Sequence, residues 1–117
     1  MKELGREIRF HPLFQPRGAN ANFVQVIGSS AIAIRTYERG VEDETLACGT
    51  GATAAAIAAN VQLHMQAPIE VRTRSGQSLT IAFTINANNK ITNVTQSGPA
   101  LWHFKGSFAL SKEDLCH

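Results

Sequence analysis

The sequence predicts an α+β domain in which an antiparallel sheet, or an incomplete barrel, wraps around one central buried helix. The helix is predicted over residues 51–63, where the run Ala-Ala-Ala-Ile-Ala-Ala strongly favours helix and no charged residue occurs from Gly49 to Gln66. The remaining chain divides into short segments in which apolar and polar residues alternate, as they do in half-buried strands. Because a helix that is apolar all round is normally buried, we expect strands on every side of it.

The segment before this helix contains a short helix and a hairpin. Leu4 and Ile8 lie four residues apart, which places them on one face of a helix over residues 2–10. Pro12 stops that helix and makes residues 11–18 irregular. Residues 22–27 and 31–37 are rich in β-branched and aromatic residues and are predicted to form the two strands of a hairpin. A charged loop follows over residues 38–44.

The segment after the helix is predicted to be β-structure, because apolar and polar residues alternate between Gly, Pro and Asn turns. The predicted strands are residues 69–73, 78–85, 91–95 and 100–110, the last of them interrupted by Gly106. Residues 111–117 form a polar tail. Since no linker, repeat or low-complexity tract separates these elements, residues 1–117 are expected to form a single domain.

Composition excludes several classes of protein. With 44% hydrophobic and 17% charged residues, the chain of 117 residues has the profile of a folded domain. The net charge is only +2 and the eleven Lys and Arg residues are scattered, which gives no case for nucleic-acid or membrane-surface binding. The sequence contains no uninterrupted apolar run of about 18 residues, and residues 1–7 lack the apolar core of a signal peptide. We expect a cytoplasmic protein.

The two cysteines have different settings. A disulfide between Cys48 and Cys116 is not expected, and no Cys or His pair has the spacing of a zinc site. Cys48 directly precedes the predicted helix and is followed by Gly-Thr-Gly. The helix dipole favours an anion there by about 0.3–1 kcal/mol, which assists ionisation of the thiol without sufficing for it. Gly49 and Gly51 leave the backbone open to a ligand carboxylate or phosphate, and Thr50 can cap the helix or donate to the ligand.

Other interpretations of the same residues stay open at this point. Cys48 can be an inert, buried, small apolar residue, with Gly-Thr-Gly serving only packing. A cysteine hydrolase would need a histidine positioned by a third group, and no His lies in such a motif. A non-catalytic module that binds a small anion or another protein is a third interpretation.

The Cys48 segment resembles a known family. Tyr-Glu-Arg-Gly at residues 37–40, a short acidic loop and Ala-Cys-Gly-Thr-Gly-Ala at residues 47–52 resemble the C-terminal half of diaminopimelate epimerases. So do residues 11–14, 18–25 and 97–100, and the similarity extends over about residues 5–110. Proline racemases also have a Cys-Gly-Thr-Gly element, but the Tyr-Glu-Arg-Gly approach favours the epimerases.

The resemblance implies a mechanism without cofactor or metal. Diaminopimelate epimerases invert one α-carbon between the LL and meso forms, in lysine and peptidoglycan precursor synthesis. One cysteine thiolate removes the α-proton and a second, facing thiol delivers a proton to the opposite face. By motif, Cys48 is one of the pair, and Gly49 and Thr50 offer main-chain donors to the α-carboxylate. Of the other positions that match substrate contacts, Arg39 suits a carboxylate, whereas Asn20 and Glu38 suit an ammonium group.

The chain departs from the family in what it lacks. It has no second Cys-Gly element, because no glycine follows Cys116, and no Gly-Asn-Pro-His stretch opens the half. We therefore expect a fragment that carries half of the site, is inactive alone and has the missing N-terminal half as its partner. Self-association into a homodimer is a further expectation, because an isolated half exposes an apolar face. The alternatives are the non-catalytic binding module and a related amino-acid racemase.

Overall fold

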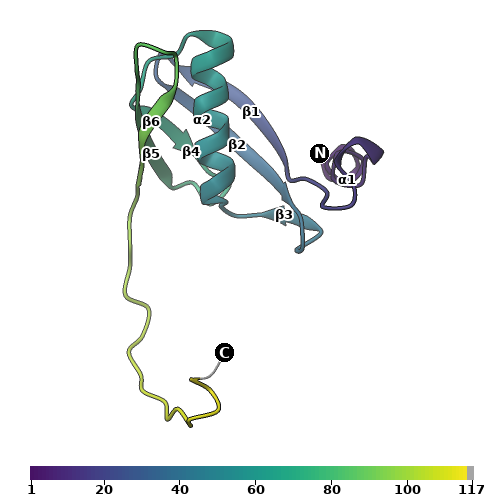
Figure 1. Cartoon of the computed structure of the whole chain (residues 1–117), viewed down its shortest axis with the longest axis vertical. Helices are drawn as coiled ribbons and strands as arrows, with labels where there is room; N and C mark the ends of the chain where they lie inside the picture. The colour runs from purple at the N-terminus through teal and green to yellow at the C-terminus, as the bar shows by residue number, and fades with distance from the viewer. Residues whose placement is uncertain (116–117) are drawn as a thin grey trace.

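The computed structural model describes residues 1–115, in which a six-stranded sheet packs against one long helix, α2 (Figure 1). The elements in chain order are α1 (Lys2–Arg9), η1 (Pro12–Phe14), β1 (Ala21–Gly28), β2 (Ala31–Glu38), β3 (Asp43–Thr45), α2 (Gly49–Leu63), β4 (Ile69–Arg72), β5 (Ser78–Ile85) and β6 (Ile91–Ser97). The predicted α+β class is confirmed, and the sheet is not closed into a barrel. Within this part of the chain, no helix has the length and apolar character needed to cross a membrane.

The sheet has the order β1-β2-β4-β5-β6, with β3 paired to β2. Every neighbouring pair is antiparallel, as predicted, except β2 and β4, which run parallel. This exception follows from the connection, because the chain passes from β2 through β3 and α2 before it enters β4. A crossover that contains a helix returns the chain to the starting end of the sheet, and this geometry gives parallel neighbours.

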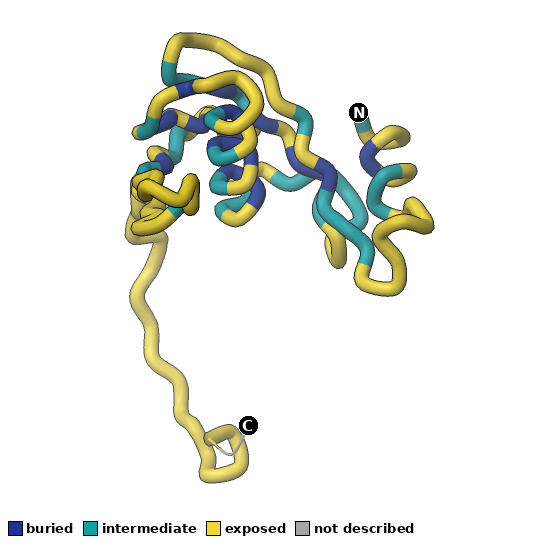
Figure 2. Tube along the Cα trace, turned by 45° about the horizontal axis from the view of Figure 1, so that its top comes forward, coloured by how far each residue is buried: buried dark blue, intermediate teal, exposed yellow. Residues whose placement is uncertain are grey.

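The core lies between one face of α2 and the sheet. Ala52, Ala56 and Ala59 are buried there against Ile32 and Ile69. These small helix side chains allow the strands to approach closely. The opposite face of α2 is exposed (Figure 2). The expectation of strands on every side of the helix was therefore wrong, because the open sheet covers one face only.

The C-terminal segment differs from its prediction. Residues 100–110 were expected to form a strand, but they have no regular secondary structure and are exposed throughout (Figure 2). A strand requires a neighbour to pair its backbone groups, and no strand of the domain lies beside this segment (Figure 1). We refer to residues 99–110 as the C-terminal arm. Cys116, and with it the question of a disulfide to Cys48, lies outside the described residues.

The short strand β3 was not predicted, and it holds an ion-pair cluster. The Glu44 carboxylate accepts hydrogen bonds from Nε and Nη2 of Arg35, both at 2.6 Å, and from Nη1 of Arg74 at 2.7 Å. The Glu44 side chain is only 7% exposed. Hydrogen bonds from Arg35, opposed by burial and aided by those from Arg74, lower the pKa of Glu44 from 4.5 to about 2. The loop before Cys48 is thereby fixed to two other segments.

This shift predicts acid sensitivity. The pKa of Glu44 is lower in the folded state, so the ionised carboxylate stabilises the fold above pH 4.5, and the contribution is lost as the pH falls towards about 2. Urea unfolding at pH 7, 4 and 3 should show a falling free energy of unfolding, and Glu44→Gln should flatten that fall. Glu3→Gln, which changes an exposed carboxylate, is the control and should keep the wild-type slope. An unchanged slope in Glu44→Gln would contradict the assignment.

Candidate functional site

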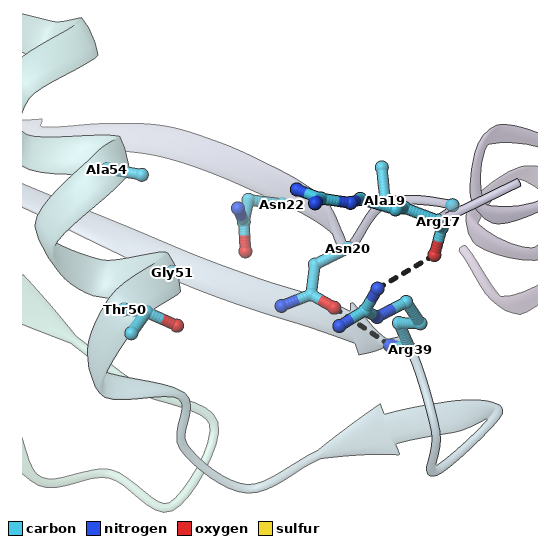
Figure 3. A pocket seen from close by; sticks show the side chains of 9 residues that line it. Arg17, Ala19, Asn20, Asn22, Arg39, Thr50, Gly51 and Ala54 are labelled. Atoms are coloured by element: carbon cyan, nitrogen blue, oxygen red, sulfur yellow. Dashed lines mark hydrogen bonds between the residues drawn. The ribbon is translucent and has the colours of Figure 1, made fainter. Parts of the chain in front are cut away.

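A cavity of about 460 Å³ lies between the start of β1, the end of the β2 segment and the first turns of α2 (Figure 3). The residues that line it are Arg17, Gly18, Ala19, Asn20, Asn22, Arg39, Thr50, Gly51 and Ala54. In Figure 3, Thr50, Gly51 and Ala54 lie on the helix, across from Asn20 and Arg39. The first turn of a helix carries unpaired N–H groups and a partial positive charge. The cavity therefore combines these groups with two guanidinium side chains, a combination suited to a carboxylate ligand.

Cys48 is the N-cap residue of α2, with an extended backbone at φ −141° and ψ 109°. Its Sγ lies 3.5 Å from Oγ1 of Thr50 and 4.0 Å from Nδ2 of Asn20, and the thiol is half-buried and free. Cys48 thus adjoins the cavity through two residues that line it. Because Cys48 itself is the N-cap, Thr50 does not cap the helix, and its hydroxyl lies beside the thiol instead.

Asn20 connects the helix start to the end of β2. Its Oδ1 accepts a hydrogen bond from the backbone N–H of Arg39 at 2.8 Å, while its Nδ2 points towards the Cys48 sulfur. The Arg39 guanidinium donates from Nη1 to the carbonyl oxygen of Arg17 at 2.8 Å (Figure 3). One hydrogen bond fixes the position of this guanidinium and leaves its other donors for a ligand.

The structure brings together most of the site residues predicted from the sequence. Asn20, Arg39 and Thr50 line the cavity, and Cys48 and Gly49 adjoin it at the helix start. Glu38, the last residue of β2, is not among the lining residues.

Among the lining residues that were not predicted, Asn22 and Arg17 have polar side chains. Asn22 pairs with Thr36 in the β1–β2 register, and its Oδ1 accepts a hydrogen bond from the buried Thr36 hydroxyl at 2.8 Å. A Cβ at Gly51 would lie 2.7 Å from this oxygen and 3.3 Å from the Cys48 sulfur, so a larger residue there would require the Asn22 amide to move. The alternation of β1 indicates which face Asn22 occupies, but not that the face meets the helix start.

Gln96 of β6 is a further unpredicted neighbour of the helix start. A Cβ at Gly49 would lie 2.9 Å from Gln96 Oε1, which shows how closely the amide covers this backbone. The Thr53 hydroxyl donates to the Gly49 carbonyl oxygen at 3.0 Å and lies 3.4 Å from Gln96 Oε1. The Gly49 carbonyl shares a peptide plane with the N–H of Thr50, so these contacts help to orient a donor of the site. No local sequence signal relates Gln96 to Gly49.

Nothing in residues 1–115 assembles three His, Cys, Asp or Glu side chains into a metal site. The chemistry available is that of a free thiol, an anion-binding helix start and two guanidinium groups.

Comparison with known proteins gives one family. The family model described as diaminopimelate epimerase matches residues 1–102. The diaminopimelate epimerase of Aquifex aeolicus (strain VF5) is 59% identical over 83 residues, which cover 70% of this chain and 30% of the relative. That of Hydrogenobaculum sp. (strain Y04AAS1) is 42% identical, covering 91% and 36%, and that of Ralstonia nicotianae (strain ATCC BAA-1114 / GMI1000) is 41% identical, covering 100% and 38%. The chain spans about a third of the length of these curated relatives.

Proposed function

Because the chain belongs to the diaminopimelate epimerase family, we propose that it supplies Cys48 as one of two acid–base thiols in a cofactor-independent epimerase. The observation that carries the proposal is the free Cys48 thiol at the N-cap of α2, beside a cavity with carboxylate-binding groups. The substrate would be diaminopimelate, inverted at one α-carbon between the LL and meso forms. The pathway would be lysine and peptidoglycan precursor synthesis, in the cytoplasm.

The proposed binding mode places the α-carboxylate at the helix start. The N–H groups of Gly49 and Thr50 would donate to it, and the α-carbon would then lie next to the Cys48 sulfur. Asn20 and Glu38 would receive the α-ammonium group, as the family match implies. Diaminopimelate has a carboxylate at each end, and the cavity is lined by two guanidinium side chains, those of Arg17 and Arg39. We assign one of these guanidinium groups to each of the two substrate carboxylates.

The proposed reaction is two proton transfers on opposite faces of one carbon. In one direction the Cys48 thiolate takes the α-proton and becomes a thiol, and the electron pair stays on the α-carbon and its carboxylate. A second thiol on the far face then gives its proton to that carbon and becomes a thiolate. In the other direction the roles reverse. Negative charge grows on the carboxylate during the transfer, where the donors at the helix start would stabilise it.

The second thiol must come from outside the matched third of the protein. We propose that the N-terminal half found in the family supplies it, since the residue after Cys116 is His117 and not the glycine that follows Cys48. The exposed side of α2 carries Val61 and Leu63, each 56% exposed, and these apolar side chains support a partner at this surface.

The purified chain alone is expected to form no meso-diaminopimelate from the LL isomer, because a single thiol serves only one face of the carbon. Chiral chromatography of the reaction mixture measures this directly. The comparison is a fusion in which this chain replaces the matching segment of the Aquifex relative, which should epimerise. Turnover by the isolated chain at the rate of the fusion would contradict the half-site. A folded but inactive fusion would instead favour a non-catalytic binding module.

A further inference from the structure

Arg9, the last residue of α1, contacts both loops that carry the guanidinium groups of the cavity but does not line the cavity itself. Its side chain is only 14% exposed, which is low for an arginine. Helix α1 is fixed to β2, because Gly5 is buried so close to Tyr37 that a Cβ there would lie 2.6 Å from Tyr37 Cβ. The Arg9 side chain therefore extends from a firmly packed helix.

The first contact of Arg9 is with the loop of Arg17. Gly18 follows Arg17 directly, has a positive φ of 72° and lies so close to Arg9 that a Cβ there would collide with Nη1 of Arg9. The carbonyl oxygen of Arg17 accepts the hydrogen bond from Nη1 of Arg39. The Arg9 guanidinium thus packs against a loop that already touches the second guanidinium of the cavity.

The second contact of Arg9 is with Glu42, in the loop after Arg39. Nε of Arg9 donates to Oε1 of Glu42 at 2.9 Å, and the same oxygen accepts the backbone N–H of Gly40 at 2.9 Å. Because Gly40 follows Arg39, one carboxylate oxygen joins α1 to the peptide beside the cavity guanidinium. Within residues 1–115, Arg9 is the only side chain that donates to Glu42, whose Oε2 is buried and accepts no hydrogen bond.

The Arg9–Glu42 pair differs from an ordinary surface ion pair. Glu42 has a positive φ of 59°, a conformation uncommon for residues other than glycine, which indicates that its side chain serves a purpose at this turn. The pair of Lys2 and Asp43 also joins α1 to this turn, at 3.0 Å, but its side chains are 68% and 49% exposed. Exposed pairs of that kind contribute little to stability. The Lys2 pair is therefore a natural control for the Arg9 pair.

We propose that Arg9 is a positioning residue that holds the two arginine-bearing loops, through Gly18 and Glu42, in the arrangement that receives a dicarboxylate. Arg9 does not touch the substrate. It fixes Arg17 and Arg39, which bind the two carboxylates under the proposed function, and the proposal rests on that function. Carboxylate binding is shared by the ground state and the transition state, so its loss raises KM and leaves the turnover number largely unchanged.

Arg9→Met in the fusion with the Aquifex relative removes the charge and keeps an unbranched side chain. KM for LL-diaminopimelate should rise about tenfold to a hundredfold, since misplacement by about 1 Å can cost about 10²-fold. The turnover number should change far less. Arg9→Lys keeps a cation within reach of Glu42 and should restore most of the KM, whereas Lys2→Met should leave KM unchanged. Steady-state kinetics of the four proteins measure both parameters.

Amide hydrogen exchange in the chain itself, followed by NMR, gives a readout that does not depend on catalysis. In Arg9→Met the N–H of Gly40 should exchange about tenfold faster, because its acceptor Glu42 is no longer held in place. Amides paired between β4 and β5 should keep their rates. The effect is then confined to the loop and separates positioning from a loss of overall stability.

An unchanged exchange rate at Gly40 would overturn the proposal, and so would an equal acceleration of every amide. A fall in turnover number at constant KM would also contradict it, because the loops would then not set substrate affinity. If Lys2→Met raised KM as much as Arg9→Met does, the specific role of Arg9 would be refuted. If the parent fusion does not epimerise, the proposed function fails, whereas faster exchange confined to residues 39–42 would still support the hold of Arg9 on this loop.

Discussion

Cys48→Ser in the epimerase-competent fusion is expected to reduce the turnover number by about 10²–10⁴, the range for loss of a positioned acid–base group. A serine hydroxyl keeps the shape of the side chain, but near neutral pH it ionises far less readily than a thiol and cannot replace it as an acid or a base. Because the N–H groups proposed to donate to the substrate carboxylate stay in place, the substrate dissociation constant should change little. Rates of meso-diaminopimelate formation, together with substrate binding measured by calorimetry, separate the two effects.

Cys116→Ser is the matched control for the Cys48 variant. Cys116 is the other cysteine of the chain, but the next residue is His117 and not glycine, so its replacement should leave turnover unchanged. Solvent-deuterium exchange adds a second readout, since a fusion with one working thiol should still exchange the α-proton of one stereoisomer. If Cys48→Ser turned over like the parent fusion, the acid–base role of this thiol would be refuted.

Gly51→Ala is expected to lower epimerase activity in the fusion by more than about tenfold, through displacement of the groups around the thiol. The added methyl group would lie 2.7 Å from Asn22 Oδ1 and 3.3 Å from the Cys48 sulfur. When Asn22 turns away to make room, its oxygen gives up the hydrogen bond of the buried Thr36 hydroxyl. Overpacking costs about 1–3 kcal/mol, whereas alanine gains only about 0.5–1 kcal/mol over glycine within a helix.

The net change in the free energy of unfolding is therefore destabilising, and urea denaturation of the isolated chain measures it. Adding Asn22→Ala to Gly51→Ala makes room for the methyl group and should recover part of the lost stability. Gly106→Ala is the control, because a Cβ there meets no atom within 4 Å. An isolated chain that is stabilised by Gly51→Ala would show that the close approach of Asn22 is not maintained in solution.

The elements predicted correctly are those specified by local patterns. Helix α2 and the β1–β2 hairpin carry strong signals in composition and turn residues, and both were found within two residues of their predicted bounds. The three-residue β3 is too short to show an alternation. The parallel pairing of β2 with β4 depends on the path of the chain around α2, which no local pattern specifies. The arm shows the limit of periodicity, since its residue pattern is that of a strand but no strand of the sheet pairs with it.

The candidate site also contains residues that the sequence predicted and residues that only the tertiary structure brings to it. Cys48, Gly49 and Thr50 are contiguous, so their place at a helix start followed from the sequence. Asn22 and Gln96 reach that helix start from β1 and β6, two strands that lie at opposite edges of the sheet. Their roles depend on tertiary packing, and a single sequence contains no local signal for it.

The crossover from β2 to β4 also has a consequence for the order of folding. The β1–β2 hairpin is a local contact that forms by closing a turn, whereas the β2–β4 pairing must close a loop that contains β3, Cys48 and α2. The entropy cost of closure grows with loop length, so the hairpin should precede this pairing. The contact between Cys48 and Asn20, which are 28 residues apart, also closes a longer loop than the hairpin does and should form after it. A nascent or misfolded chain would carry Cys48 without its contacts to Asn20 and Thr50, as an ordinary exposed cysteine that is open to oxidation.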